Sequence, residues 1–220
     1  MKLKHIIVGA VAVLMLGACS KKFEQLLNNP NNPSPDAASS DLFLTQAQLS
    51  FVDFFNTASS FGMEVTRQVT WFGPTYLNGY SPASFNGMWS TAYTGVFKHV
   101  NALLPLAVAE KKFVHVAIAK TLKAYTMITL VDYFGDVPLD EANLGLENTN
   151  PKLNKGSDVY AKAIALLIEA KADLAKTSAF FPGSLDLFYT TTGADGIAKW
   201  NSAINTLLLR AYLGTRLVDN

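Results

Sequence analysis

The stretch that decides the fold is VHVAIAKTLKAYTMITLVDYFGDVPL, residues 114–139. Its apolar side chains recur at helical spacing. Those that share one helix face are Val114, Ile118, Leu122, Tyr125 and Ile128. We expect this helix to end at Gly135, because glycine commonly caps the C-terminus of a helix, and Pro138 prevents the helix from resuming. The segment therefore predicts a long amphipathic helix followed by a turn.

Working outward from this segment, apolar periodicity predicts four more helices. They cover residues 36–59, about 84–104, 157–176 with Ser157 as N-cap, and 195 to the chain end. The loops between them, at 73–84, 137–156 and 182–196, are rich in Gly, Pro, Asn and Thr. Helices of about 20 residues in successive pairs are typical of tetratricopeptide-like repeats. We therefore predict an all-α, tetratricopeptide-like helical repeat scaffold with long loops. Because the last helix has no sequential partner, we expect this domain, 36–220, to continue beyond Asn220.

The composition excludes several classes of protein. Of 220 residues, 50% are hydrophobic, 11% aromatic and 16% charged, which is too apolar for a disordered chain. The formal net charge is only +1, so the chain lacks the basic field that nucleic-acid binding requires. A single cysteine excludes a disulfide framework and a cysteine-rich zinc site. We expect no cofactor and no metal.

The N-terminus reads as a lipoprotein signal peptide, residues 1–18. Lys2 and Lys4 precede a mostly apolar run at 6–16, which is too short to span a membrane. The run ends in LGAC, residues 16–19, where two small residues precede the only cysteine. This pattern predicts lipidation of the Cys19 thiol, and several acyl chains make a durable membrane anchor. The alternatives are a plain signal peptide or a buried helix that happens to contain a cysteine.

Residues 19–35 would form the lipidated N-terminus and a tether. Asn and Pro alternate in this segment, which excludes a helix. Ser20 follows Cys19 where an aspartate would favour retention in the inner membrane. We therefore expect the mature protein to be anchored in the outer membrane.

Exposed flat aromatic rings and planar polar groups are the side chains that suit a sugar ligand. The predicted ligand-binding residues are Trp71, Tyr76, Asn78 and Tyr80. They lie in the 73–84 loop or, for Trp71, directly before it. The alternative is that Trp71 and its neighbour Phe72 close the core. Phe188 and Tyr189 form a second aromatic pair in a loop, whereas Trp89 and Trp200 lie on helical stripes and are predicted to be core residues.

No catalytic motif stands out in the sequence. It contains no G-x-S-x-G, H-E-x-x-H, P-loop or G-x-G-x-x-G pattern. His99 and His115 fall within apolar helical patterns and are expected to be helix-face residues. One acidic cluster consists of Asp132, Asp136, Asp140 and Glu141. We interpret it as a helix end and turn, in which Asp136 bonds nearby backbone amides. The alternative is the carboxylate pair of a glycoside hydrolase.

Several segments resemble the SusD/RagB outer-membrane lipoproteins of Bacteroidetes, in the branch called SusD-like type 2. They are the lipidation motif LGAC (16–19), NNPNNP (28–33), WSTAY (89–93) leading to NALL (101–104), LKAY (122–125), DYFGDVPL (132–139), VY (159–160) with DL (173–174), and Trp200 with LRAY (209–212). Their order and rough spacing match along nearly the whole mature chain. Two departures are Lys123, where the family usually has arginine, and the shorter length of this chain.

The resemblance implies a non-catalytic, cell-surface lipoprotein. Such a protein would bind oligosaccharides and deliver them to a SusC-like, TonB-dependent β-barrel transporter. A peptide ligand, as in the RagB branch, is the first alternative, and a lipid-anchored glycoside hydrolase using Asp136 and Asp140 is the second. The matching motifs belong to the scaffold, so the resemblance transfers no sugar-binding residue and only Cys19 carries over.

Overall fold

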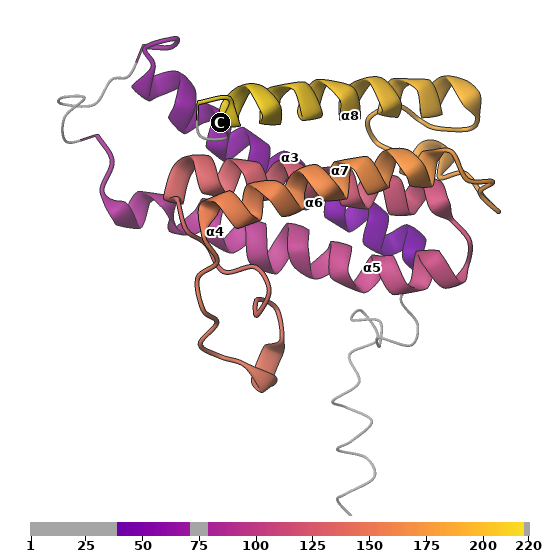
Figure 1. The fold of residues 1–220 in the computed structure, drawn as a ribbon, viewed down its shortest axis with the longest axis horizontal. Helices are drawn as coiled ribbons and strands as arrows, with labels where there is room; N and C mark the ends of the chain where they lie inside the picture. The colour runs from indigo at the N-terminus through magenta and orange to yellow at the C-terminus, as the bar shows by residue number, and fades with distance from the viewer. Residues whose placement is uncertain (1–38, 71–78, 218–220) are drawn as a thin grey trace, which may run out of the picture. The chain divides into compact units, whose positions relative to one another are not determined.

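The computed structural model describes residues 39–70 and 79–217. Within these ranges the chain forms helices joined by turns and loops, with no β-strand. The main helices are α3 (Ser40–Val65), α4 (Asn86–Ser90), α5 (Lys98–Ala109), α6 (Phe113–Phe134), α7 (Gly156–Leu174) and α8 (Ala194–Thr215). From α5 onward, successive long helices run antiparallel (Figure 1). The predicted all-α class is confirmed.

Helix α6, which contains the decisive stretch, is the centre of the bundle. It packs against α3, α5, α7 and α8, and buried side chains lie on every side of it. Among the described helices it alone is long and apolar enough to cross a membrane, but most of that stretch is buried by its neighbours. The apolar composition of α6 is therefore explained by its place in the core.

The predicted helix at 84–104 is continuous but irregular. It begins with a 3₁₀ turn at Pro82–Phe85, passes through α4, widens into a π-helix at Thr91–Phe97 and continues as α5 to Ala109, past Pro105. The π segment lies where α3 comes very close, because a Cβ added at Gly95 would be 2.9 Å from the Ser50 Cβ. The turn after α5 is made by Lys111, which has a φ of 56°, and the next helix starts at Phe113.

The start of α7 shows that the predicted N-cap, Ser157, is wrong. Gly135 ends α6 as expected, with a φ of 74°. Helix α7, however, begins at Gly156 with Lys155 as N-cap, and Ser157 makes no capping bond. The cap comes instead from Asp136, whose Oδ1 accepts a hydrogen bond of 2.8 Å from the Gly156 N–H. Glycine is needed at 156 because a Cβ there would lie 2.9 Å from the Val131 side chain.

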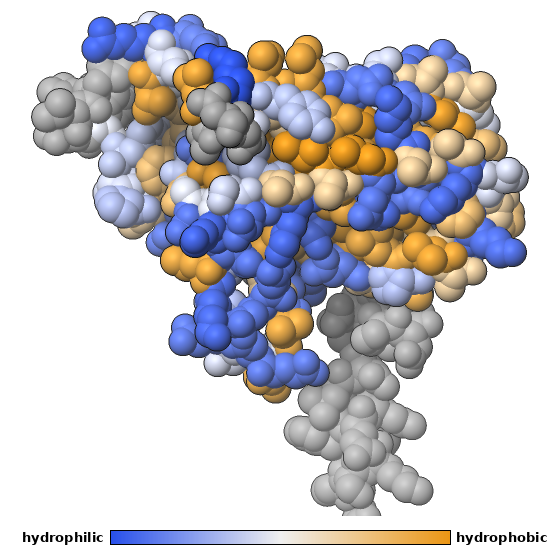
Figure 2. Space-filling model, in the orientation of Figure 1, coloured by the Kyte–Doolittle hydropathy of each residue, from blue (hydrophilic) through white to orange (hydrophobic). Residues whose placement is uncertain are grey.

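Helix α8 packs against two of the preceding helices. It rests on α7 and α6 and buries Trp200, Ile204 and Ala211. Its outward face leaves Leu209 and Leu213 more than half exposed, and Figure 2 shows apolar side chains mixed with polar ones over this helix.

Candidate functional site

A groove lined by aromatic residues runs between α3 and α8, with α6 as its floor. It consists of two adjoining hollows of about 640 and 590 Å³ that share Tyr125. The residues that define this aromatic groove are Phe51, Phe55, Asn56, Tyr125, Tyr133, Phe188, Tyr189, Trp200, Thr206 and Arg210. Pockets of this size, mostly apolar with a few polar groups, are typical of small-molecule sites.

The aromatic rings pack edge to face along one wall of the groove. The Tyr125 and Phe188 rings are 5.2 and 6.0 Å from the Phe51 ring, and the Tyr189 ring is 5.0 Å from that of Trp200. Such edge-to-face contacts stabilise aromatic clusters by about 0.5–1.5 kcal/mol per pair beyond area burial. Trp200 is buried, whereas Phe188 and Tyr189 are 39% and 36% exposed. The last two therefore offer ring surface to a ligand.

The loop that carries these two rings is fixed by the carboxylate of Asp186. This fully buried side chain accepts hydrogen bonds from the backbone N–H groups of Phe188 and Tyr189 at 3.1 and 3.2 Å. It also accepts from the Thr191 N–H at 3.3 Å, the Thr191 hydroxyl at 2.6 Å and the Trp200 indole N–H at 2.8 Å. All of these partners are donors, so an ionised carboxylate satisfies them together.

Helix α3 holds the same loop from the other side. The Gln48 amide is fully buried, donates to the Leu185 carbonyl at 2.7 Å and accepts from the Leu187 N–H at 2.9 Å. The position of the loop is thus determined by residues on α3 and α8 together. This preorganised loop lowers the entropic cost of binding a ligand against its rings.

A charged group lies along the groove toward the end of α8. The Arg210 guanidinium lies 5.3 Å from the centre of the Tyr125 ring and donates to Asp132 at 3.3 Å. The Tyr160 hydroxyl also donates to Asp132, and burial together with this carboxylate raises the pKa of the Tyr160 phenol. Arg210 therefore keeps a fixed orientation, with donors beside an aromatic face.

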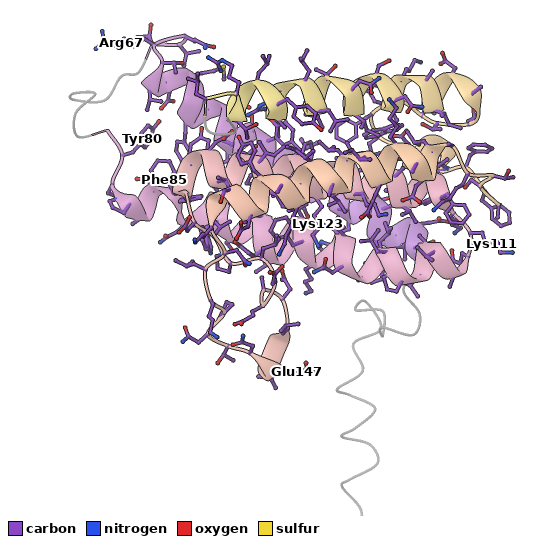
Figure 3. The ribbon with its side chains drawn as sticks, viewed as in Figure 1. Arg67, Tyr80, Phe85, Lys111, Lys123 and Glu147 are labelled. Atoms are coloured by element: carbon purple, nitrogen blue, oxygen red, sulfur yellow. The ribbon has the colours of Figure 1, made fainter. Side chains whose placement is uncertain are left out.

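Most of the predicted ligand-binding residues, namely Trp71, Tyr76 and Asn78, lie outside the described residues, as does Cys19. Tyr80 is described and half-buried, and its ring is 4.8 and 5.9 Å from the Phe61 and Phe85 rings. Figure 3 shows Tyr80 and Phe85 at the same end of the bundle. The role of Tyr80 as a ligand contact stays a prediction.

The predicted tryptophans and histidines lie within or beside the core. Trp200 is buried, and Trp89 is half-buried and packs its ring 5.0 Å from that of Phe134. His115 is almost completely buried, with its Nε2 3.0 Å from an Asp41 oxygen. His99 is half-buried and is bonded to the Gly95 carbonyl at 2.6 Å.

The acidic cluster is occupied by structural contacts. Asp140 binds the Lys162 ammonium at 2.5 Å, and Glu141 accepts from the Asn148 amide at 2.9 Å. Asp132 and Asp136 are engaged by the arginine, tyrosine and helix cap described above. Over the described ranges, no group of three or more His, Cys, Asp and Glu side chains is arranged to hold a metal ion.

Sequence reasoning missed the groove itself. The apolar spacing predicts Tyr125 on a helix face, and of the other groove residues it singles out only Phe188 and Tyr189 as an aromatic pair in a loop. The available signal was an aromatic pair in a polar loop, placed between an aspartate and the 190–192 threonines. The groove depends on α3, α6 and α8 meeting in space, which periodicity alone does not show.

Comparison with known proteins gives a family. The family model SusD-like_2, described as starch-binding and associating with the outer membrane, matches residues 30–219. The crystal structure of a SusD/RagB family protein from Bacteroides thetaiotaomicron is similar, with a TM-score of 0.62 and 21% sequence identity. The match covers 80% of this chain and 38% of that one. No curated protein matches the chain. Because the family model spans most of its length, this chain belongs to the SusD/RagB family, in the SusD-like branch.

Proposed function

We propose that this protein is a non-catalytic, cell-surface lipoprotein that captures oligosaccharides in the aromatic groove and passes them to a SusC-like, TonB-dependent transporter. The observation that carries the proposal is the groove itself, in a chain whose family is described as starch-binding. Lipidation of Cys19 and the 19–35 tether would keep the domain at the outer membrane. The presented aromatic rings would cover the C–H faces of sugar rings.

The polar groups of the groove suit hydroxyl groups. The Arg210 guanidinium, the Asn56 amide and the Thr206 hydroxyl all line it. Sugar hydroxyls need such donors and acceptors, because a polar group buried without a partner costs free energy. A non-catalytic role agrees with the carboxylates, since each one in the acidic cluster is already bound to a cation, amide or hydroxyl of the fold.

The test is calorimetry of the purified protein against a panel that begins with malto-oligosaccharides and includes other glycans and short peptides. We expect Tyr189→Ala to weaken binding of the preferred glycan about tenfold, which corresponds to about 1.4 kcal/mol. The matched control is Tyr212→Ala, because this tyrosine is 54% exposed on α8 and lies outside the groove.

Three outcomes would count against the proposal. Unchanged glycan affinity in Tyr189→Ala and Phe188→Ala would remove the groove as the site and move attention to Tyr80 and the loop before it. Binding of peptides without glycans would assign the protein to the peptide-binding alternative. Release of new reducing ends from the glycan, abolished by Asp136→Asn, would show that the protein is a glycoside hydrolase.

A further inference from the structure

A second, smaller pocket lies on a different side of α6. It is an open hollow lined by residues of α5, α6, α7 and the loop after α6, and has a volume of about 400 Å³. Its polar lining residues are Asn101, Lys123, Asp140 and Lys162, and its apolar ones are Met127, Leu139, Ala142, Leu144 and Leu166. This lysine pocket shares no residue with the aromatic groove. Its volume suits one small ring rather than a long chain.

Lys123 is the unusual group of the pocket. Its Nζ donates to the Asn101 Oδ1 at 2.7 Å and lies 5.8 Å from the centre of the Phe97 ring. In the described part of the chain, no carboxylate lies within ion-pair distance of this ammonium. Figure 3 shows Lys123 in the middle of the bundle, where α6 faces α5. Burial lowers the pKa of the Lys123 ammonium, as expected for a cation that has lost water without gaining a counter-ion.

The neighbouring carboxylate does not neutralise Lys123, because it is engaged elsewhere. Asp140 binds the Lys162 ammonium at 2.5 Å and accepts from the Asn154 amide at 2.8 Å. These contacts lower the pKa of the Asp140 carboxyl, so it remains ionised and paired. The pocket thus holds two ammonium groups and one carboxylate, which leaves an excess of one positive charge.

The outer wall of the pocket is held in place. The Asn154 side-chain oxygen accepts from the N–H groups of Leu139 and Asp140 at 2.9 and 3.1 Å. The Asn143 amide donates to the Tyr93 carbonyl at 2.9 Å. Leu139 and Leu144 therefore present apolar surface to a pocket that also holds the Lys123 ammonium, which has no ion-pair partner among the described residues. A ligand that fits needs one negative charge and an apolar face.

We propose that the lysine pocket binds a uronic acid unit, with its carboxylate on the Lys123 ammonium and the C–H face of its ring on the leucines. A single carboxylate matches the single excess charge, whereas a dianionic phosphate would remain half-neutralised. The Asn101 amide lies beside Lys123 and is able to bond a ring hydroxyl. Because this pocket shares no residue with the aromatic groove, uronic acid binding here is tested independently of the proposed function.

The test compares sodium glucuronate, glucose and sodium acetate as probes of the purified protein by NMR titration. We expect glucuronate to bind at least about tenfold more tightly than either of the others, because one charge-assisted hydrogen bond supplies at least that factor. Glucuronate is also expected to raise the pKa of Lys123, followed through the lysine ¹³Cε resonance. Lys123→Met should abolish the preference over glucose, while Lys98→Met, which removes an exposed lysine of α5, should keep it.

Four results of the binding measurements would overturn the proposal. They are equal affinity for glucuronate and glucose, equal affinity for acetate and glucuronate, an unchanged preference in Lys123→Met, and a loss of preference in Lys98→Met as large as in Lys123→Met. The ¹³Cε titration uses the unaltered protein, so it tests the contact even where a variant changes the fold. A Lys123 pKa that glucuronate leaves unmoved would also reject the contact.

Discussion

Replacing Asp186 by asparagine tests whether one buried carboxylate organises the groove loop. The change keeps the shape of the side chain but replaces one oxygen by an NH₂ group. If the NH₂ takes the place of Oδ1, the backbone N–H groups of Phe188 and Tyr189 lose their acceptor. If it takes the place of Oδ2, the N–H groups of Thr191 and Trp200 lose theirs, while the threonine hydroxyl is free to rotate.

Either orientation therefore leaves at least two N–H groups without an acceptor. Each such group costs about 1–3 kcal/mol when it is buried, so we expect Asp186→Asn to lower the free energy of unfolding by about 2–6 kcal/mol. That is a large share of the roughly 5–15 kcal/mol that stabilises a typical domain. Urea unfolding, followed by tryptophan fluorescence and by circular dichroism, measures the change.

The matched control for this experiment is Asp195→Asn at the start of α8. Asp195 is 85% exposed and pairs with Lys199 at 2.7 Å, an arrangement that contributes only about 0.3–0.5 kcal/mol. If Asp186→Asn costs no more than this control, the carboxylate does not organise the loop and the reasoning fails.

Two further predictions concern stability. Gly196→Ala should destabilise the protein, because the new Cβ would lie 2.6 Å from the Thr191 Cα, whereas Gly87→Ala has open space and should stabilise by about 0.4–1 kcal/mol; equal midpoints in thermal unfolding would refute the contrast. Burial lowers the pKa of both His115 and His99, so the unfolded chain binds protons first as the pH falls below about 6.5. The free energy of unfolding should then decrease toward lower pH, by at most about 1.4 kcal/mol per pH unit for each histidine. Urea unfolding between pH 7 and 5 measures this slope, and a slope as steep in the double His→Gln variant as in the wild type would contradict the assignment.

The helices could be predicted from the sequence because their signals are local. The apolar spacing at Val114–Ile128 and the glycine at 135 need only neighbouring residues to be understood. The π segment at Thr91–Phe97 could not be predicted, since it lies where a second helix comes within contact of Gly95.

Neither candidate site could be predicted as a whole, for the same reason. In the sequence, Asp186 is one of several polar residues in a loop. Its role is seen only in the structure, where the Trp200 indole N–H donates to it at 2.8 Å. In the sequence, Lys123 differs from the family pattern, which usually has arginine at this position. The absence of a carboxylate partner among the described residues becomes visible only when α5 and α7 are in place. Pairing across elements, not residue type, defines both sites.

The two proposed sites are linked through the geometry of α6. Lys123 and Tyr125 are two positions apart, which separates their directions by about 200° around a helix. Tyr125 therefore faces the groove between α3 and α8, and Lys123 faces the pocket beside α5 and α7. A core helix that is buried on every side can present a different site to each pair of neighbours. Because the sites share no side chain, a ligand in one need not displace any residue that the other uses. The central helix is thus able to contribute to both proposed sites at once.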